Sequence, residues 1–182
     1  MLKSILLIAT AFSVSQPALQ LASQTIVEDG AGGMARAANR MIGGIISYVG
    51  WPDKRGAAGR NLCQVGTPQL ASDPVAAGLP NGRHLIVRRI TAAAAIADGD
   101  CDILFLGRMP VGDRQRLIGW VRTRAVLTIT DDDPACLYGA MFCLARRSAG
   151  LGFSVNLDAI GRSPLRVDPR VLQIGHGDGG TS

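Results

Sequence analysis

The sequence predicts one α/β domain, with a mixed, mostly parallel sheet that helices flank on both faces and that a C-terminal antiparallel hairpin completes. Three observations support this fold class. Short apolar runs alternate with segments of helical spacing, which favours parallel strands joined by helices on both faces of one sheet. The last two apolar runs are separated by only a few residues, which is typical of a hairpin. The chain of 182 residues is long enough for one hydrophobic core and too short for two ordinary domains once an N-terminal signal is removed.

In the first half of the chain, predicted helices and strands alternate. Apolar residues recur every three or four positions over residues 34–48, which predicts a helix. Residues 61–65 and 84–90 are short apolar runs next to glycine-containing turns, so both are predicted strands. The Ala-rich residues 68–78 between them are compatible with a short crossover helix. Residues 91–96 begin with a threonine, a good N-cap, and continue with alanines, which predicts another helix.

The second half continues this alternation and then changes to a hairpin. Residues 102–106 are predicted to form a buried strand because an unbroken apolar run follows Asp102, and residues 113–121 have the spacing of a helix. Residues 125–130 are predicted to form the next strand. The apolar runs at residues 140–145 and 152–157 then predict two antiparallel strands, because the segment between them is too short for a crossover.

Both ends of the chain are expected to lie outside the domain. Residues 1–22 contain one lysine, an apolar stretch of about ten residues and a polar, proline-containing exit, which is the order of a secretory signal peptide. That stretch is shorter than the roughly 20 apolar residues of a transmembrane helix. We expect cleavage within residues 15–24. At the other end, residues 164–174 predict a last short helix, and the Gly-rich residues 175–182 predict a disordered tail.

Four cysteines follow the predicted signal, namely Cys63, Cys101, Cys136 and Cys143. In an exported protein they predict two structural disulfides, whereas in a cytosolic protein they would suggest metal or redox chemistry. The sequence alone leaves all three connectivities open. Cys63 lies in the first predicted strand and Cys101 at the start of the third, so adjacent strands would bring these two within bonding distance.

The positive charge of the chain does not point to nucleic acid. The formal net charge is +5, and most of the positive side chains are arginines scattered singly or in short pairs. A nucleic-acid-binding domain concentrates such charge on one helix or stripe and interleaves aromatic residues for stacking. The chain has two Trp and two Tyr and no such stripe. We therefore expect no nucleic-acid partner.

Few residues are suited to catalysis or to metal binding. Three consecutive aspartates precede Pro134, but calcium needs about six to eight oxygens from a spaced loop, so the run predicts a strand end and a turn. The two histidines, His84 and His176, and the absence of a CxxC pair leave a zinc site without its ligands. No serine has the local context of an activated nucleophile. We expect a protein that is not an enzyme, with no catalytic residue, no metal and no cofactor.

Several short segments, taken in their order and spacing, resemble the YfiR family of periplasmic proteins. They include Trp51-Pro52 at the end of the first predicted helix and Leu62-Cys63 in the first predicted strand. The remaining segments are residues 82–87, 101–105, 126–131, 139–141 and 153–156. The resemblance covers about residues 34–174, the whole predicted domain, and all four cysteines fall where the family pairs them.

The resemblance implies disulfides between Cys63 and Cys101 and between Cys136 and Cys143. It also implies a non-catalytic periplasmic regulator that represses an inner-membrane diguanylate cyclase by binding the periplasmic sensor region of that enzyme. Cyclic-di-GMP signalling, and with it biofilm formation, would fall. An outer-membrane lipoprotein would release the repression. A homodimer is a further possible assembly.

The two implied disulfides close loops of different length. The 38-residue separation of Cys63 and Cys101 would restrict the unfolded chain by about 4 kcal/mol on the loop-entropy estimate. The seven-residue separation of Cys136 and Cys143 would contribute about 2.5 kcal/mol. We therefore expect the first disulfide to matter more for stability, and the second to be the more exposed one and to pin a surface loop.

The sequence departs from the family pattern at Ala140, where a second glycine is usual, and in the turn at Asp168. These changes affect the local surface, and so the identity of the partner, more than the fold. The candidate contacts with a partner or ligand are Trp51, Arg162 and Arg166. Trp51 is a residue type over-represented in binding hot spots, with a core position as an equal alternative. The two arginines are suited to a carboxylate or phosphate, with ordinary solvated arginines as the default alternative.

Two functions from different classes follow from these observations. A regulator that binds a protein partner predicts an exposed apolar patch larger than scattered surface residues would give. The alternative, a periplasmic small-molecule sensor or binding module, predicts a concave pocket of several hundred cubic ångströms with a few converging polar groups. A ligand of such a pocket would also change partner binding if it favoured one of two states of the protein.

Overall fold

A computed structural model describes the chain except for residues 1–25, 29, 31, 72–78, 80–83 and 175–182. The predicted signal peptide and the predicted Gly-rich tail lie outside the described residues. No helix within the described part is both long enough and apolar enough to cross a bilayer.

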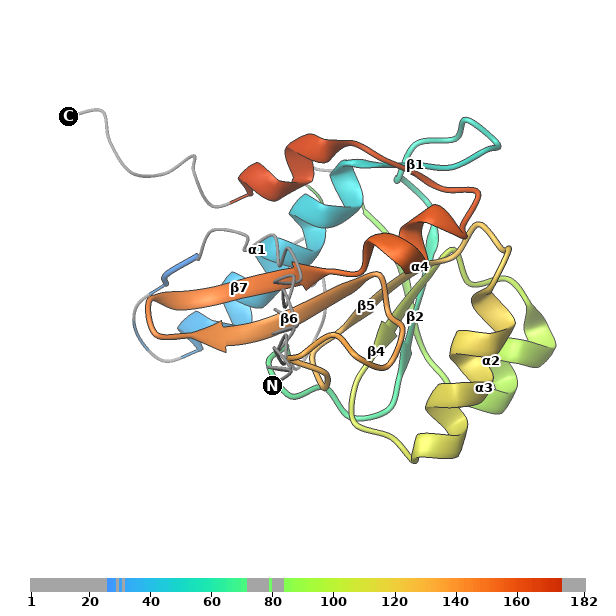
Figure 1. Ribbon diagram of the computed structural model, residues 1–182, viewed down its shortest axis with the longest axis horizontal. Helices are drawn as coiled ribbons and strands as arrows, with labels where there is room; N and C mark the ends of the chain where they lie inside the picture. Colours follow the sequence, from blue (N-terminus) through green and yellow to red (C-terminus); the bar gives the residue numbers. More distant parts are fainter. Residues whose placement is uncertain (1–25, 29, 31, 72–78, 80–83, 175–182) are drawn as a thin grey trace, which may run out of the picture.

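The domain is built on a six-stranded sheet (Figure 1). Its strands are β2 (Asn61–Val65), β3 (Ile86–Arg89), β4 (Ile103–Leu106), β5 (Leu127–Thr130), β6 (Phe142–Arg147) and β7 (Gly150–Val155). In space they follow the order β3-β2-β4-β5-β6-β7. Neighbours are parallel except β6 and β7, which form an antiparallel hairpin. The predicted fold class is confirmed.

Helices cover both faces of the sheet. Alternate residues of β4 show the two layers, because Ile103 and Phe105 belong to the core under α1 (Gly33–Ser47) whereas Leu104 and Leu106 belong to the core under the other helices. Those helices are α2 (Ala92–Asp98) and α3 (Val111–Val121). Figure 1 shows α1 passing behind the β6-β7 hairpin and α2 beside α3 on the other side of the molecule. Strands buried on both faces lose the polar alternation, which explains their continuous apolar runs.

Helix α1 forms where the apolar spacing predicts it. Its buried face contains Ala38, Met41, Ile42 and Ile45, which recur at the predicted three- and four-residue intervals. Gly44 interrupts the helix-forming sequence for a tertiary reason, because a Cβ at this position would lie 3.1 Å from Cδ1 of Ile174. A glycine here lets the C-terminal segment pack closely against α1.

Helix α2 is capped as the sequence predicts, because the hydroxyl oxygen of Thr91 accepts a hydrogen bond of 3.1 Å from the backbone N–H of Ala94. Helix α3 begins at Val111, two residues before the predicted start, with Pro110 as its N-cap. Proline suits this position, since its missing N–H would be unsatisfied at a helix start anyway.

Strand β6 begins and ends two residues later than predicted, and strand β7 begins and ends two residues earlier. Arg147 pairs with Gly150, so the turn contains only two residues and the exposed arginines at the end of β6 belong to the strand. The prediction ends this strand at residue 145 because the apolar run ends there. The prediction that strand structure extends to residue 157 is wrong, because Asn156 caps a short helix, α4 (Leu157–Gly161), through a 2.9 Å bond from the N–H of Ala159.

Two further predictions need correction. Instead of one helix over residues 164–174, the structure has a short strand, β8 (Arg166–Val167), followed by a 3-10 helix, η1 (Pro169–Gln173). Strand β8 pairs with β1 (Val49–Gly50) in a separate two-stranded sheet, so it needed a distant partner that no local pattern reveals. Of the predicted crossover helix over residues 68–78, the described part, residues 68–71, is not helical, and residues 72–78 lie outside the described residues.

Candidate functional site: a disulfide-braced loop beside helix α3

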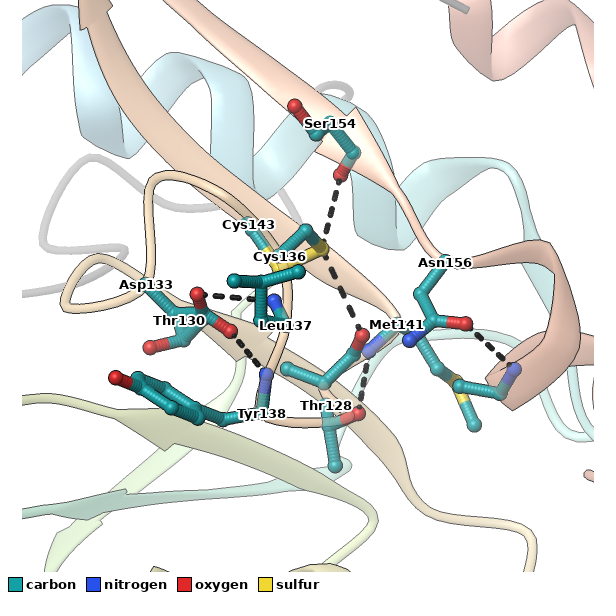
Figure 2. Close-up of a disulfide and its surroundings, with 12 residues drawn as sticks. Thr128, Thr130, Asp133, Cys136, Leu137, Tyr138, Met141, Cys143, Ser154 and Asn156 are labelled. Atoms are coloured by element: carbon teal, nitrogen blue, oxygen red, sulfur yellow. Dashed lines mark hydrogen bonds between the residues drawn. A yellow bond between two sulfur atoms is a disulfide. The ribbon is translucent and has the colours of Figure 1, made fainter. Parts of the chain in front are cut away.

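Among the described residues, the most exposed large apolar side chain is that of Leu137, which lies beside a cavity in the loop between β5 and β6. We call this loop, residues 131–141, the disulfide loop. The Sγ atoms of Cys136 and Cys143 are 2.00 Å apart and tie this loop to β6 (Figure 2). Cys143 is fully buried and Cys136 is half-buried, with a left-handed φ of 56°. This disulfide is the more exposed of the two, as predicted.

The tip of the disulfide loop is fixed from inside by Asp133. Its carboxylate accepts hydrogen bonds from the backbone N–H groups of Leu137, at 3.0 Å, and Tyr138, at 2.7 Å (Figure 2). Gly139 follows with a φ of 93°, and a Cβ there would lie 2.9 Å from Cγ2 of Ile118 on α3. These contacts fix the backbone of the loop against α3 at the positions that carry its two large side chains, Leu137 and Tyr138.

Asp132 fixes the same loop to α3 by an ion pair. Its carboxylate lies 2.6 Å from a guanidinium nitrogen of Arg114, which is almost fully buried. Arg114 also donates to the carbonyl oxygen of Gly107 at 3.3 Å, and its guanidinium carbon lies 5.4 Å from the ring centroid of Tyr138. A buried arginine with these partners is an anchor rather than a free cation.

Asp131 contacts the segment that follows β2 rather than α3 or the loop tip. One carboxylate oxygen accepts two hydrogen bonds of 2.7 Å, from the backbone N–H groups of Gln69 and Leu70. The other oxygen, Oδ1, is buried without a hydrogen-bond partner. Burial raises the pKa of Asp131 above its ordinary value. The three aspartates thus serve three separate contacts, and the predicted strand end and turn are confirmed.

The raised pKa of Asp131 gives a prediction for Asp131→Asn. The folded state holds the proton more tightly than the unfolded state, whose pKa is near 3.8. We therefore expect wild type to gain stability relative to the variant as pH falls from 7 through the raised pKa towards 4. Urea unfolding of both proteins at several pH values measures this difference. A difference that is constant, or that moves in the opposite direction, would contradict the assignment.

Two adjoining hollows flank the tip of the disulfide loop. The inner hollow, of about 290 Å³, lies between the end of α3, the loop and α4. The outer hollow, of about 710 Å³, lies along α3 and contains Arg114 and Asp132. They share Ile118, Arg122, Leu137 and Tyr138.

The rim of these hollows is apolar and exposed. Leu137 is 77% exposed, Tyr138 59% and Val111, at the start of α3, 67%. All three line the outer hollow. Apolar side chains gathered in this way indicate an interaction surface more strongly than single exposed residues do.

The structure places Trp51 in the core, with 5% exposure. Its ring lies under the guanidinium of Arg60, whose Cζ is 4.1 Å from the ring centroid. Arg60 is 1% exposed and forms ion pairs with Asp53, at 2.6 Å, and Asp102, at 2.8 Å. The arginine lowers the pKa of Asp53 well below its ordinary value. This geometry favours the core interpretation of Trp51 over that of a surface contact.

The two predicted binding arginines lie in different places. Arg162, at the end of α4, lines the inner hollow and forms an ion pair with Asp158. Arg166 is exposed in β8, where its backbone pairs with Gly50. The site residues that the sequence analysis missed are Arg114 and Arg122. Each is a lone arginine in a helix or at its end, and no local pattern distinguishes them from solvated ones.

The other disulfide joins Cys63 to Cys101, with their Sγ atoms 2.01 Å apart and both residues buried. The pairing in both disulfides is the one that the family resemblance implies. Asp100 lies near this pair, and the three residues have the proximity of metal ligands. Because the two sulfurs are bonded to each other, only one carboxylate is left, and a metal site is not supported here.

Two solved structures are remotely similar to this chain. O-acetylhomoserine sulfhydrylase of Wolinella succinogenes is 12% identical with a TM-score of 0.44, over 75% of this chain and 41% of its own. Alanine–glyoxylate aminotransferase of Nostoc sp. is 13% identical with a TM-score of 0.47, over 87% of this chain and 46% of its own. The chain spans less than half the length of each enzyme, and both likenesses are too remote to bear on function.

A family model described as YfiR/HmsC-like matches residues 35–176, which include every helix and strand after the first two residues of α1. This range includes both disulfides and the disulfide loop. The chain therefore belongs to the YfiR/HmsC-like family, a family of non-catalytic periplasmic regulators of diguanylate cyclases.

Proposed function

We propose that this protein binds the periplasmic sensor region of an inner-membrane diguanylate cyclase and represses the enzyme, so that cyclic-di-GMP signalling falls. Family membership supports the regulatory class. The observation that carries the binding role is the exposed apolar rim of the disulfide loop, formed by Leu137, Tyr138 and Val111. This is the kind of patch that a protein-binding regulator predicts.

The rim has the composition and rigidity of a binding surface. Tyrosine is enriched in binding hot spots, and a tyrosine stacked near an arginine presents a large contact area with few rotatable bonds. The disulfide and the carboxylate of Asp133 fix the backbone that carries Leu137 and Tyr138. A surface that is ordered before binding loses less conformational entropy when the partner docks.

Export to the periplasm belongs to the same proposal. Two disulfides fit an oxidising compartment, and the predicted signal in residues 1–22 would deliver the chain there. Release by an outer-membrane lipoprotein follows from the family resemblance, and homodimerisation stays an open alternative. Co-purification of the oxidised protein from membranes tests both the lipoprotein contact and the homodimer.

The double change Leu137→Ser and Tyr138→Ser is expected to weaken binding to the cyclase sensor region by about thirtyfold, or about 2 kcal/mol. Both side chains are exposed, so folding should be unaffected. In cells that lack the native gene, the variant should fail to lower cyclic-di-GMP, whereas wild type should lower it.

The matched control is Ile86→Ser, which makes the same chemical change at a residue 52% exposed on β3, at the far edge of the sheet. It should repress as wild type does. If the gene has no effect on cyclic-di-GMP, the proposed function is wrong. If Ile86→Ser is inactive and the double variant is active, the function stands and the surface is misplaced.

A second function, small-molecule binding, is favoured by the inner hollow. Its volume of about 290 Å³ is near the lower end for ligand pockets, and polar side chains that follow α3 and that lie in or beside α4 line it. The same hollow lies behind Leu137 and Tyr138, so the two functions are compatible in one protein.

A further inference from the structure

The inner hollow combines an apolar wall with an uncompensated positive charge. Ile118 and Val121 of α3 and Met141 before β6 supply the wall, and Leu137 closes it from the disulfide loop. Val121 and Met141 are buried, so this wall is part of the folded core rather than a mobile surface. An apolar ligand body placed here would remove apolar surface of both the protein and the ligand from water, which favours binding.

The net positive charge of the hollow's lining comes from two arginines and one aspartate. Arg162 forms an ion pair with Asp158, and both line the hollow. Arg122, at the end of α3, also lines it, and among the described residues its guanidinium has no hydrogen bond or ion pair. The lining therefore keeps one net positive charge, carried by a guanidinium whose paired N–H donors match a carboxylate.

Asn156, just before α4, supplies a further hydrogen-bond donor to the inner hollow. The side-chain oxygen of Asn156 accepts from the N–H of Ala159, which orients the amide, and its nitrogen has no partner among the described residues. Figure 2 shows Asn156 beside Met141 and near Thr128. All three residues line the hollow. Charged and neutral donors thus face a cavity whose other wall is apolar.

We propose that the inner hollow binds a small monocarboxylate with an apolar body, and that Arg122 pairs with the carboxylate. The volume of about 290 Å³ is roughly twice the ~150 Å³ of an engineered apolar cavity that holds benzene, which leaves room for one ring and a short acidic chain. A dianion would exceed the single positive charge, and the excess would be poorly solvated beside the apolar wall.

This inference deepens the second proposed function and does not depend on a protein partner. The ligand would lie against Leu137 and Tyr138, the side chains that we assign to partner docking. Binding in this hollow would therefore change the docking surface directly, without a distant conformational relay. Ligand affinity and partner affinity are measured separately, so failure of one proposal leaves the other testable.

The test uses the purified, oxidised full chain and calorimetric titration with phenylacetate, 3-phenylpropionate and hexanoate, with phenylacetamide as the uncharged match. We expect at least one carboxylate to bind with a submillimolar Kd and the amide to bind at least tenfold more weakly. Arg122→Gln should weaken carboxylate binding at least tenfold. The control Arg124→Gln, an arginine stacked on Trp120 outside this hollow, should not.

Methyl resonances of the methionines report where the ligand lies. The chain has five methionines, of which Met141 lines the inner hollow and Met109 the outer one. Carboxylate titration should shift the Met141 signal and leave Met109 in place. The proposal is overturned if no carboxylate binds, if the amide binds equally well, if Arg122→Gln binds as wild type does, or if only Met109 shifts. Unchanged melting temperature in both arginine variants rules out misfolding as the cause.

Discussion

Replacing Cys63 and Cys101 together with alanine is expected to lower the free energy of unfolding by about 4 kcal/mol. The bond links β2 to Cys101, two residues before the start of β4, and closes a separation of 38 residues in the unfolded chain. Both sulfurs lie in the core between the sheet and the pair α2-α3, so small cavities at these sites add to the loss. Urea unfolding under non-reducing conditions measures the change.

The matched variant removes Cys136 and Cys143 in the same way. Its loop separation is seven residues, and the expected loss is about 2.5 kcal/mol. The disulfide loop should then become more susceptible to proteolysis, because only non-covalent contacts, chiefly the hydrogen bonds to Asp133, would hold its tip. Equal losses for the two variants, or a larger loss for the second, would show that loop length does not govern the contribution of these bonds.

The change Arg60→Met is expected to lower the free energy of unfolding by about 3 kcal/mol. The Arg60 side chain fills a closed position between Trp51, Asp53 and Asp102 and also donates to the carbonyl oxygen of Gly56 at 3.0 Å. Methionine fills similar space but donates nothing. The partly buried carboxylate of Asp102 would then keep its hydrogen bond from the N–H of Asn61 and a 3.9 Å ion pair with the exposed Arg55.

Arg55→Met is the control for this prediction. Arg55 also pairs with Asp53, but its side chain is exposed and solvent screens the interaction. We expect its unfolding curve to match that of wild type closely. If both variants lose similar stability, burial of the Arg60 guanidinium is not the source of the effect. Intrinsic fluorescence of Trp51 gives an independent readout of the loss of stacking on this ring.

Local sequence determined most of the domain. Apolar-rich runs placed β2, β4 and β5 nearly to the residue, because strands buried on both faces contain few polar residues. The spacing of α1 and the threonine cap of α2 are equally local signals. Strand β8 and the shifted hairpin were missed because exposed residues join a strand through backbone pairing, which needs a partner and not an apolar side chain.

The sequence predicted the backbone frame of the candidate site, but it did not predict which side chains are exposed on its surface. The cysteines and the aspartate run marked the disulfide loop as a turn next to a strand. Nothing local indicated that Arg114 is buried in an ion pair with Asp132 while Arg122, eight positions along, faces a hollow. The exposed pair Leu137-Tyr138 likewise has no distinctive sequence, since apolar residues are ordinarily assigned to the core.

The sequence by itself determined the fold class, the order of the main elements and, through its resemblance to a family, the expected class of function. Only the tertiary structure decided which arginines are anchors and which are free to bind. Backbone periodicity and apolar burial act over a few neighbouring residues, so a sequence displays them directly. The role of a charged side chain depends on what solvent and counter-charge surround it, and these come from segments that only folding brings together.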